Sequence, residues 1–163
     1  PLTQFGLLLA CLIHHVDLDR VWRLFMQDRF DKLRSCIYET ESEKDRFIQV
    51  LVQCVVATQP DNAEPALRWH RAFDGDLDQV WDRRTMAILE GLAQMACGAH
   101  CLQPWSMYQR WKRLYVDQYG NEHFGEDRML PLVRRMQDSG VLGGTAGPGY
   151  VVQAELNFEK AKA

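Results

Sequence analysis

The segment Phe47-Ile-Gln-Val-Leu-Val-Gln-Cys-Val-Val56 decides the fold of this chain, because its two glutamines are its only polar residues. A helix that is apolar around most of its circumference is buried among other elements. The segment follows Thr40 and Glu43, which fit a capping box: the threonine side chain accepts from a backbone amide three residues on, and the glutamate reaches back. The sequence therefore predicts a central, buried helix that begins near residue 41.

Apolar residues recur at spacings of three and four on both sides of this segment, which is the period of amphipathic helices. The further helices predicted this way span about 2–13, 21–25, 30–37, 63–73, 76–101, 104–115, 128–137 and 151–162. Residues 140–149 contain five glycines, so a loop is predicted there. Neither strand alternation nor a repeat is visible. We therefore predict an all-α, compact multi-helix bundle, one domain over 1–163 with 145–163 as a candidate peripheral tail.

Composition narrows the function classes. The net charge is −3, and charges of both signs alternate along the chain, which gives no basic surface for nucleic acid. The five cysteines are odd in number and form no CxxC pair, which indicates reduced, buried thiols rather than a disulfide framework. The longest apolar run, 5–13, is shorter than the roughly 20 residues that span a bilayer. We expect an intracellular protein that binds no nucleic acid and has no membrane span.

Three groups of residues stand out in chain order: Leu12-Ile-His-His-Val-Asp17; then Asp31–Tyr38, Thr40-Glu41 and Val55-Val-Ala-Thr58; and then 87–103, Trp105, Tyr108, Trp111, Pro131-Leu132 and 140–143. Together they resemble the catalytic domain of class I cyclic-nucleotide phosphodiesterases, an all-helical, metal-dependent family. The resemblance covers roughly residues 1–145 and about the last two-thirds of a family catalytic domain. It implies the helical fold of HD-type phosphodiesterases, whereas the first third, with its H-N-x-x-H motif, has no counterpart here.

The resemblance implies a two-metal reaction for an intact family member, in which two divalent ions about 3.5–4 Å apart activate a bridging water. His14 matches the first ligand of the family's H-D-x-D-H motif. His15, however, stands where the bridging aspartate belongs, and a neutral imidazole cannot bridge two cations as a carboxylate does. Asp17 keeps the next acid, but Leu18 replaces the second histidine. In an alternative register, residues 16–22 match a later family segment and the loop after the motif is deleted.

Downstream positions depart from the family in the same way. Gln59 occupies an acid position, and Cys97 stands at the later metal-binding aspartate. The resemblance places Asn121 at the glutamine that pairs with the purine and Phe124 at the aromatic clamp. We therefore predict no catalytic residue, no metal ligand and no cofactor, with His14, His15, Asp17 and Cys97 as vestigial catalytic positions and Asn121 and Phe124 as vestigial substrate positions.

These departures favour a catalytically degenerate phosphodiesterase-like domain that serves as a structural or interaction subunit with other protein subunits. One alternative is an active phosphodiesterase, of which this is a partial chain, with zinc and magnesium held partly by the remainder. Another is a non-catalytic cyclic-nucleotide-binding module that uses Asn121 and Phe124. A single zinc site is a weaker reading than buried thiols and helix-end histidines; its candidate ligands are His14, His15, Cys97, His100 and Cys101. The aromatic stripe formed by Trp105, Tyr108, Trp111 and Tyr115 fits a core or an interface better than ligand stacking.

Overall fold

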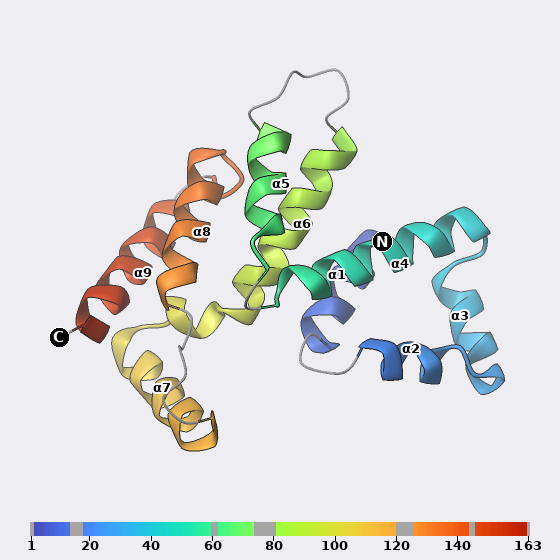
Figure 1. Cartoon of the computed structure of the whole chain (residues 1–163), viewed down its shortest axis with the longest axis horizontal. Coiled ribbons are helices and arrows are strands. Elements are labelled where there is room, and N and C mark those ends of the chain that lie inside the picture. Colours follow the sequence, from blue (N-terminus) through green and yellow to red (C-terminus); the bar gives the residue numbers. More distant parts are fainter. Residues whose placement is uncertain are drawn as a thin grey trace. The chain divides into compact units, whose positions relative to one another are not determined.

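The computed structural model describes residues 2–13, 18–59, 62–73, 81–119, 126–143 and 146–162. Within these ranges every regular element is a helix and no strand occurs, which confirms the all-α prediction (Figure 1). The elements are α1 (Leu2–Ile13), α2 (Leu18–Phe25), the 3₁₀ helix η1 (Asp28–Phe30), α3 (Asp31–Ile37), α4 (Glu41–Ala57), α5 (Glu64–Phe73), α6 (Trp81–Cys97), the 3₁₀ helix η3 (Ala99–Leu102), α7 (Trp105–Tyr119), α8 (Glu126–Asp138) and α9 (Ala146–Lys162).

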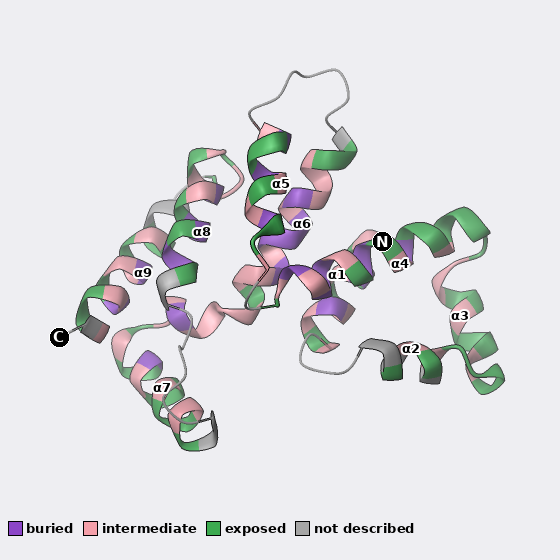
Figure 2. Cartoon of the chain, in the orientation of Figure 1, coloured by how far each residue is buried: buried purple, intermediate pink, exposed green. Residues whose placement is uncertain are grey.

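The described residues group into two compact units, 1–94 and 95–163. The single domain predicted over 1–163 stays a prediction. In the first unit the core forms around α4, as the sequence predicts, and includes residues of α1 and α6. Its buried members are Ala10, Phe47, Val50, Leu51, Cys54, Val55, Leu89 and Ala93. Figure 2 shows buried residues along α4 and α6, whereas α3 has none.

Helix α1 packs closely along α4 because Gly6 faces it. A Cβ atom at Gly6 would lie 3.2 Å from the Cγ1 atom of Val50 and 3.6 Å from the Cδ2 atom of Phe47. Ala10, one turn further on, is also buried. Residues four apart share a helix face, so this pair of small residues brings the two backbones together and selects the side of α1 that is buried.

The predicted capping box at the start of α4 is confirmed. The Oγ1 atom of Thr40 accepts from the amide of Glu43 at 3.2 Å, and the Oε2 atom of Glu43 accepts from the amides of Glu39 and Thr40. These backbone hydrogen bonds lower the pKa of Glu43. At the other end of α4, the side-chain amide of Gln94 donates to the carbonyl oxygen of Ala57 at 2.9 Å, which fastens α6 to α4.

Helix α5 runs beside α6 (Figure 1), and side chains join them. The Nε atom of Arg84 donates to the carbonyl oxygen of Ala72 at 2.9 Å. Helix α6 ends at Cys97, and a 3₁₀ turn follows in which the amide of Cys101 donates to the carbonyl oxygen of Gly98. The prediction of one helix to about residue 101 was therefore wrong at its end, because the chain continues as the 3₁₀ helix η3 over Ala99–Leu102. Its predicted start at residue 76 lies outside the described residues.

In the second unit α8 packs along α9, and η3 contacts both α7 and α9. The buried side of α8 carries Met129, Leu130, Leu132, Val133 and Met136. The loop predicted over 140–149 is shorter than expected, because α9 begins at Ala146 and takes in Pro148. A proline is tolerated in the first turn of a helix, where its missing N–H would have no partner.

Hydrogen bonds from Asn157 link α9 to the segment before α7. Its side chain is buried, and its Nδ2 atom donates to the carbonyl oxygens of Cys101 at 2.7 Å and Gln103 at 2.8 Å. We expect Asn157→Asp to destabilise the second unit by about 2 kcal/mol, because both donations are lost and a carboxylate then faces two carbonyl oxygens. Hydrogen exchange at pH 7 should show lost protection in α9 and unchanged protection in α4. Equal protection of α9 in both proteins would contradict this role.

Candidate functional site

Most of the predicted vestigial positions lie outside the part of the chain that the structure describes. His14, His15 and Asp17 fall in the gap between residues 13 and 18, and Asn121 and Phe124 fall in the gap between residues 119 and 126. Leu18 is the first residue of α2. What the resemblance implies for these positions stays a prediction.

Gln59 and Cys97 are described. Gln59 is exposed two residues beyond the end of α4, and Cys97 is the half-buried last residue of α6. Among the described side chains, no three of histidine, cysteine, aspartate or glutamate come together in a group that could hold a metal ion. The described side chains include three of the candidate ligands for a single zinc site: Cys97, His100 and Cys101.

All five cysteines fall within the described ranges, and none of them forms a disulfide. Cys54 and Cys101 are buried as predicted, but Cys36 is exposed, so the expectation of buried thiols was wrong there. Burial is the main reason that the pKa of Cys54 is raised, to about 12, and the nearby charge of Glu90 adds to it. Burial likewise raises the pKa of Cys11.

These differences predict an order of thiol reactivity, because the thiolate is the reacting form. With iodoacetamide at pH 8, we expect Cys36 to be alkylated first and Cys54 to react at least about a hundredfold more slowly, since its thiolate is scarce and buried. Peptide mass spectrometry over a time course measures both rates. The difference should vanish in urea, and similar rates in the native protein would contradict the burial of Cys54.

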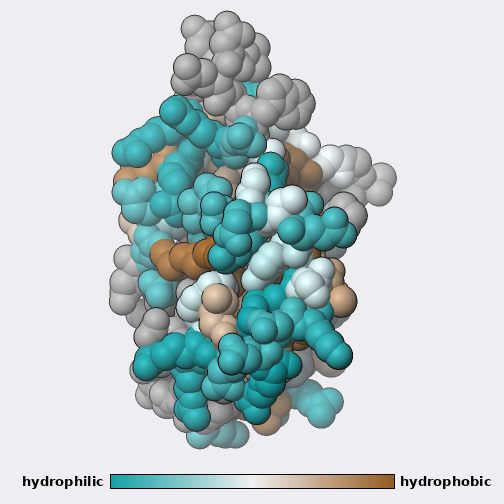
Figure 3. Space-filling view, turned by 90° about the vertical axis from the view of Figure 1, so that its right-hand side faces the viewer, coloured by the Kyte–Doolittle hydropathy of each residue, from teal (hydrophilic) through white to brown (hydrophobic). Residues whose placement is uncertain are grey.

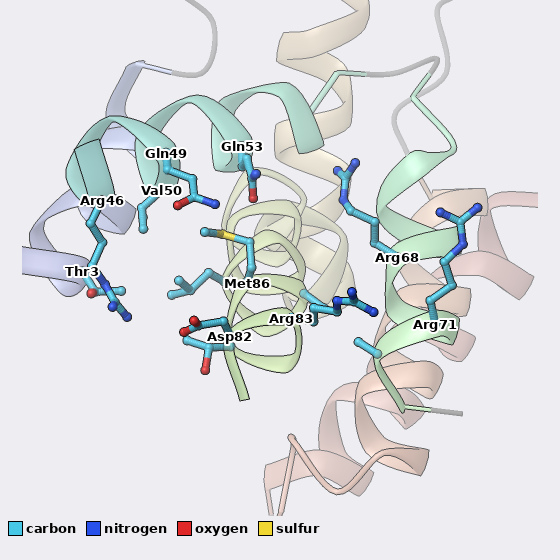
Figure 4. A pocket seen from close by; sticks show the side chains of 14 residues that line it. Thr3, Arg46, Gln49, Val50, Gln53, Arg68, Arg71, Asp82, Arg83 and Met86 are labelled. Atoms are coloured by element: carbon cyan, nitrogen blue, oxygen red, sulfur yellow. The ribbon is translucent and has the colours of Figure 1, made fainter. Parts of the chain in front are cut away.

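A cavity of about 520 Å³ lies in the first unit, lined by residues of α1, α4, α5 and α6. Four arginines line it. Arg46 belongs to α4 on one side, Arg68 and Arg71 belong to α5 on the other, and Arg83 belongs to α6 between them (Figure 4). Of the described residues that line it, Asp82 is the single acidic one. The cavity therefore has an excess of positive charge in a protein whose net charge is −3.

Of the four arginines, Arg68 forms an ion pair within the fold. Its Nε atom donates to the Oε2 atom of Glu90 at 3.1 Å, and its Nη2 atom lies 3.0 Å from the Oε1 atom. That second contact is poorly aligned, so the Oε1 atom accepts no hydrogen bond from the described residues. Glu90 is 1% exposed. Burial raises the pKa of Glu90, while the hydrogen bond and the charge of Arg68 act in the opposite direction.

The other three arginines differ from Arg68. Arg46, Arg71 and Arg83 are exposed, and within the described ranges no ion pair or hydrogen bond joins their guanidinium groups to another residue. Two amides, those of Gln49 and Gln53 on α4, also line the cavity. Three cations and two neutral donors thus remain available to a molecule in the cavity.

The outer face of α1 is a second candidate surface. Phe5, Leu8 and Leu12 lie on it, and the side chains of Leu8 and Leu12 are 64% and 79% exposed. No residue of α1 is charged. Surface helices of globular proteins normally carry polar residues opposite their buried side. The outer face of α1 is apolar instead, which is unusual for a solvent-exposed helix face.

In the second unit α7 also has an exposed apolar face, formed by Met107, Trp111 and Leu114. Tyr108 is fully buried on another side of the helix, and its ring stacks on that of Trp105 with centroids 5.0 Å apart. The aromatic stripe predicted from the sequence is therefore divided between the core and the surface. By contrast, the surface turned to the viewer in Figure 3 is mostly hydrophilic, with hydrophobic groups in small separate patches.

Sequence reasoning missed the cavity arginines. A signal was present in the run Ile88-Leu-Glu-Gly-Leu92, where a glutamate interrupts an apolar stretch and calls for a buried cation. Arg68 and Arg71, three apart, share a face of α5. Nothing in the sequence, however, places α5 against α6, and this packing is what creates the cavity.

Comparison with known proteins finds no matching family, no matching curated protein and no matching solved structure. No helix in the described ranges is long and apolar enough to cross a membrane. The described residues thus define an all-helical protein whose first unit holds an arginine-lined cavity and an apolar helix face.

Proposed function

We propose that this chain is a catalytically inactive, phosphodiesterase-like helical domain that serves as an interaction subunit of a larger protein assembly. The resemblance stated above supports the first part, because His15, Leu18, Gln59 and Cys97 stand at positions where the family has metal ligands or acids. Loss of a bridging carboxylate alone removes charge neutralisation on which a two-metal reaction depends.

The observation that carries the interaction role is the exposed outer face of α1. Covering a leucine side chain contributes about 1.5–3 kcal/mol, and Leu8 and Leu12 are both largely exposed. Because α1 has no charged residue, its occupant must be apolar as well. We assign this face to the apolar side of an amphipathic helix from another polypeptide, a common mode of helix recognition.

To test the interaction role, the partner is first identified by cross-linking from α1. The purified partner is then mixed with this chain. Sedimentation should show a stoichiometric complex that Leu8→Glu combined with Leu12→Glu weakens at least about a hundredfold, because two charges enter an apolar contact. Leu67→Glu, which places a charge at an exposed leucine of α5 outside the α1 face, should change the affinity by less than about threefold. Unchanged affinity in the double variant contradicts the proposal, as does an α1 face occupied only by a second copy of this chain.

The inactive state is tested separately. The purified chain, mixed with cyclic AMP or cyclic GMP and magnesium, should produce no nucleoside monophosphate above the background rate. Turnover at an ordinary enzymatic rate, about 1 per second or faster, would overturn the inactive part of the proposal and favour an active phosphodiesterase.

A further inference from the structure

The arginine-lined cavity of the first unit has the dimensions and the chemistry of a small-molecule site. Small-molecule sites are usually concave and about 300–1,000 Å³ in volume, with apolar walls and a few polar groups. The cavity, at about 520 Å³, falls within this range. Its apolar wall includes Val50, Met86 and Leu89, and a methionine adapts its shape readily to a bound group.

The charges of the lining indicate the kind of ligand. Arg68 is already paired with the buried Glu90. Among the described lining residues, Asp82 is the one carboxylate beside Arg46, Arg71 and Arg83 that is not paired with Arg68. Like charges gathered around one cavity repel each other, and an anion relieves that repulsion. Guanidinium groups bind phosphate in bidentate geometry more effectively than other cations do.

The cavity lies away from Cys97, the vestigial catalytic position that the structure describes. On α6 the cavity is lined from Asp82 to Leu89, whereas Cys97 ends the helix. At 1.5 Å per residue, Arg83 and Cys97 are about 20 Å apart along the helix axis. The cavity and Cys97 therefore occupy different halves of the described part of α6.

From these observations we propose that the cavity binds a small organic phosphate, a molecule with a terminal phosphate or pyrophosphate and an apolar or aromatic body. The proposal assigns the phosphate to Arg71 and Arg83, which line the cavity from α5 and α6, with Arg46 on α4, and the body of the ligand to Met86 and Val50. Figure 4 shows the three guanidinium groups apart from one another, so they turn toward the phosphate when it binds. Arg68 acts as a positioning residue, because its pairing with Glu90 fixes α5 against α6.

Calorimetry with three probes tests this assignment. ADP carries both the phosphate and an aromatic body, pyrophosphate carries only the charge, and adenosine carries only the body. We expect ADP to bind, pyrophosphate to bind at least about tenfold more weakly, and adenosine to give no heat at millimolar concentration. Adenosine binding as tightly as ADP would overturn the anion assignment, and so would the absence of heat with both ADP and pyrophosphate.

Variants locate the binding. Arg71→Ala and Arg83→Ala should each weaken ADP binding by about tenfold or more, because each removes charge-assisted hydrogen bonds. Both arginines are exposed and have no partner in the described ranges, so the fold should be unchanged, and circular dichroism checks it. The matched control is Arg110→Ala on α7, an exposed arginine outside the cavity, which should leave the affinity unaltered. Equal losses in the control would overturn the site, as would binding of an acidic peptide in preference to ADP.

Discussion

Replacing Phe47 with alanine is expected to destabilise the first unit by about 3–5 kcal/mol, the usual cost of deleting a fully buried aromatic side chain. The Phe47 side chain is 0% exposed. Its ring lies 6.0 Å from those of Phe5 and Tyr38 and 6.4 Å from that of Phe25, measured between centroids. α1, the end of α2 and the segment before α4 all pack on the Phe47 side chain. The substitution therefore removes contacts to all three segments.

Hydrogen exchange resolved by peptide, combined with urea unfolding, measures this loss in each unit. Protection should fall in α1 and α4 and remain in α8, whose buried residues belong to the second unit. Val52→Ala is the matched control, because Val52 lies on the same helix and is exposed; its effect should stay within about 0.5 kcal/mol. A Phe47→Ala protein with the stability of the control would contradict α4 as the centre of the core.

The sequence predicts a helix well where interactions between residues close in the sequence determine its position. The capping box fixed the start of α4 because Thr40 and Glu43 satisfy backbone groups within a single turn. The errors arise where two local preferences compete. Glycines favour a loop before residue 150, but Pro148 is acceptable in a first turn and α9 begins at Ala146.

Sites depend on packing between distant segments, which periodicity does not supply. For α1, an apolar helix without charges, periodicity cannot select the buried side; the small residues Gly6 and Ala10 select it by allowing close approach to α4. This leaves Leu8 and Leu12 exposed. The cavity arginines are similar, because their positions on α4, α5 and α6 become neighbours only in the folded unit. The resemblance to phosphodiesterases indicates the vestigial positions but says nothing of this cavity.

Arg68→Ala is expected to destabilise the first unit by about 3 kcal/mol at pH 8, since it leaves the carboxylate of Glu90 buried without a cation. The value is at the lower end for a broken buried pair, because the Arg68 side chain is 36% exposed. Arg71→Ala, a turn further along α5, removes an exposed arginine without a partner in the described ranges. It should change the stability by no more than about 0.5 kcal/mol.

The pH dependence distinguishes this electrostatic cause from a loss of packing. Burial raises the pKa of Glu90 above its ordinary value of 4.5, so the native state binds the proton more readily than the unfolded state. Stability is therefore lost as the pH rises from that value through the raised pKa. Without Arg68 the pKa of Glu90 rises further, and the loss extends to higher pH. The difference between wild type and Arg68→Ala should thus be small at pH 5 and largest at pH 8, as measured by urea unfolding.

Adding Glu90→Gln to Arg68→Ala removes the titrating group and should abolish the pH-dependent part of the difference, because a neutral amide is far easier to bury than a carboxylate. A double-mutant cycle at each pH then isolates the coupling between the two side chains. If Arg68→Ala were equally destabilising at pH 5 and pH 8, the ion pair would not be the link between α5 and α6. The arginine excess of the cavity would then have to be explained without a fixed Arg68.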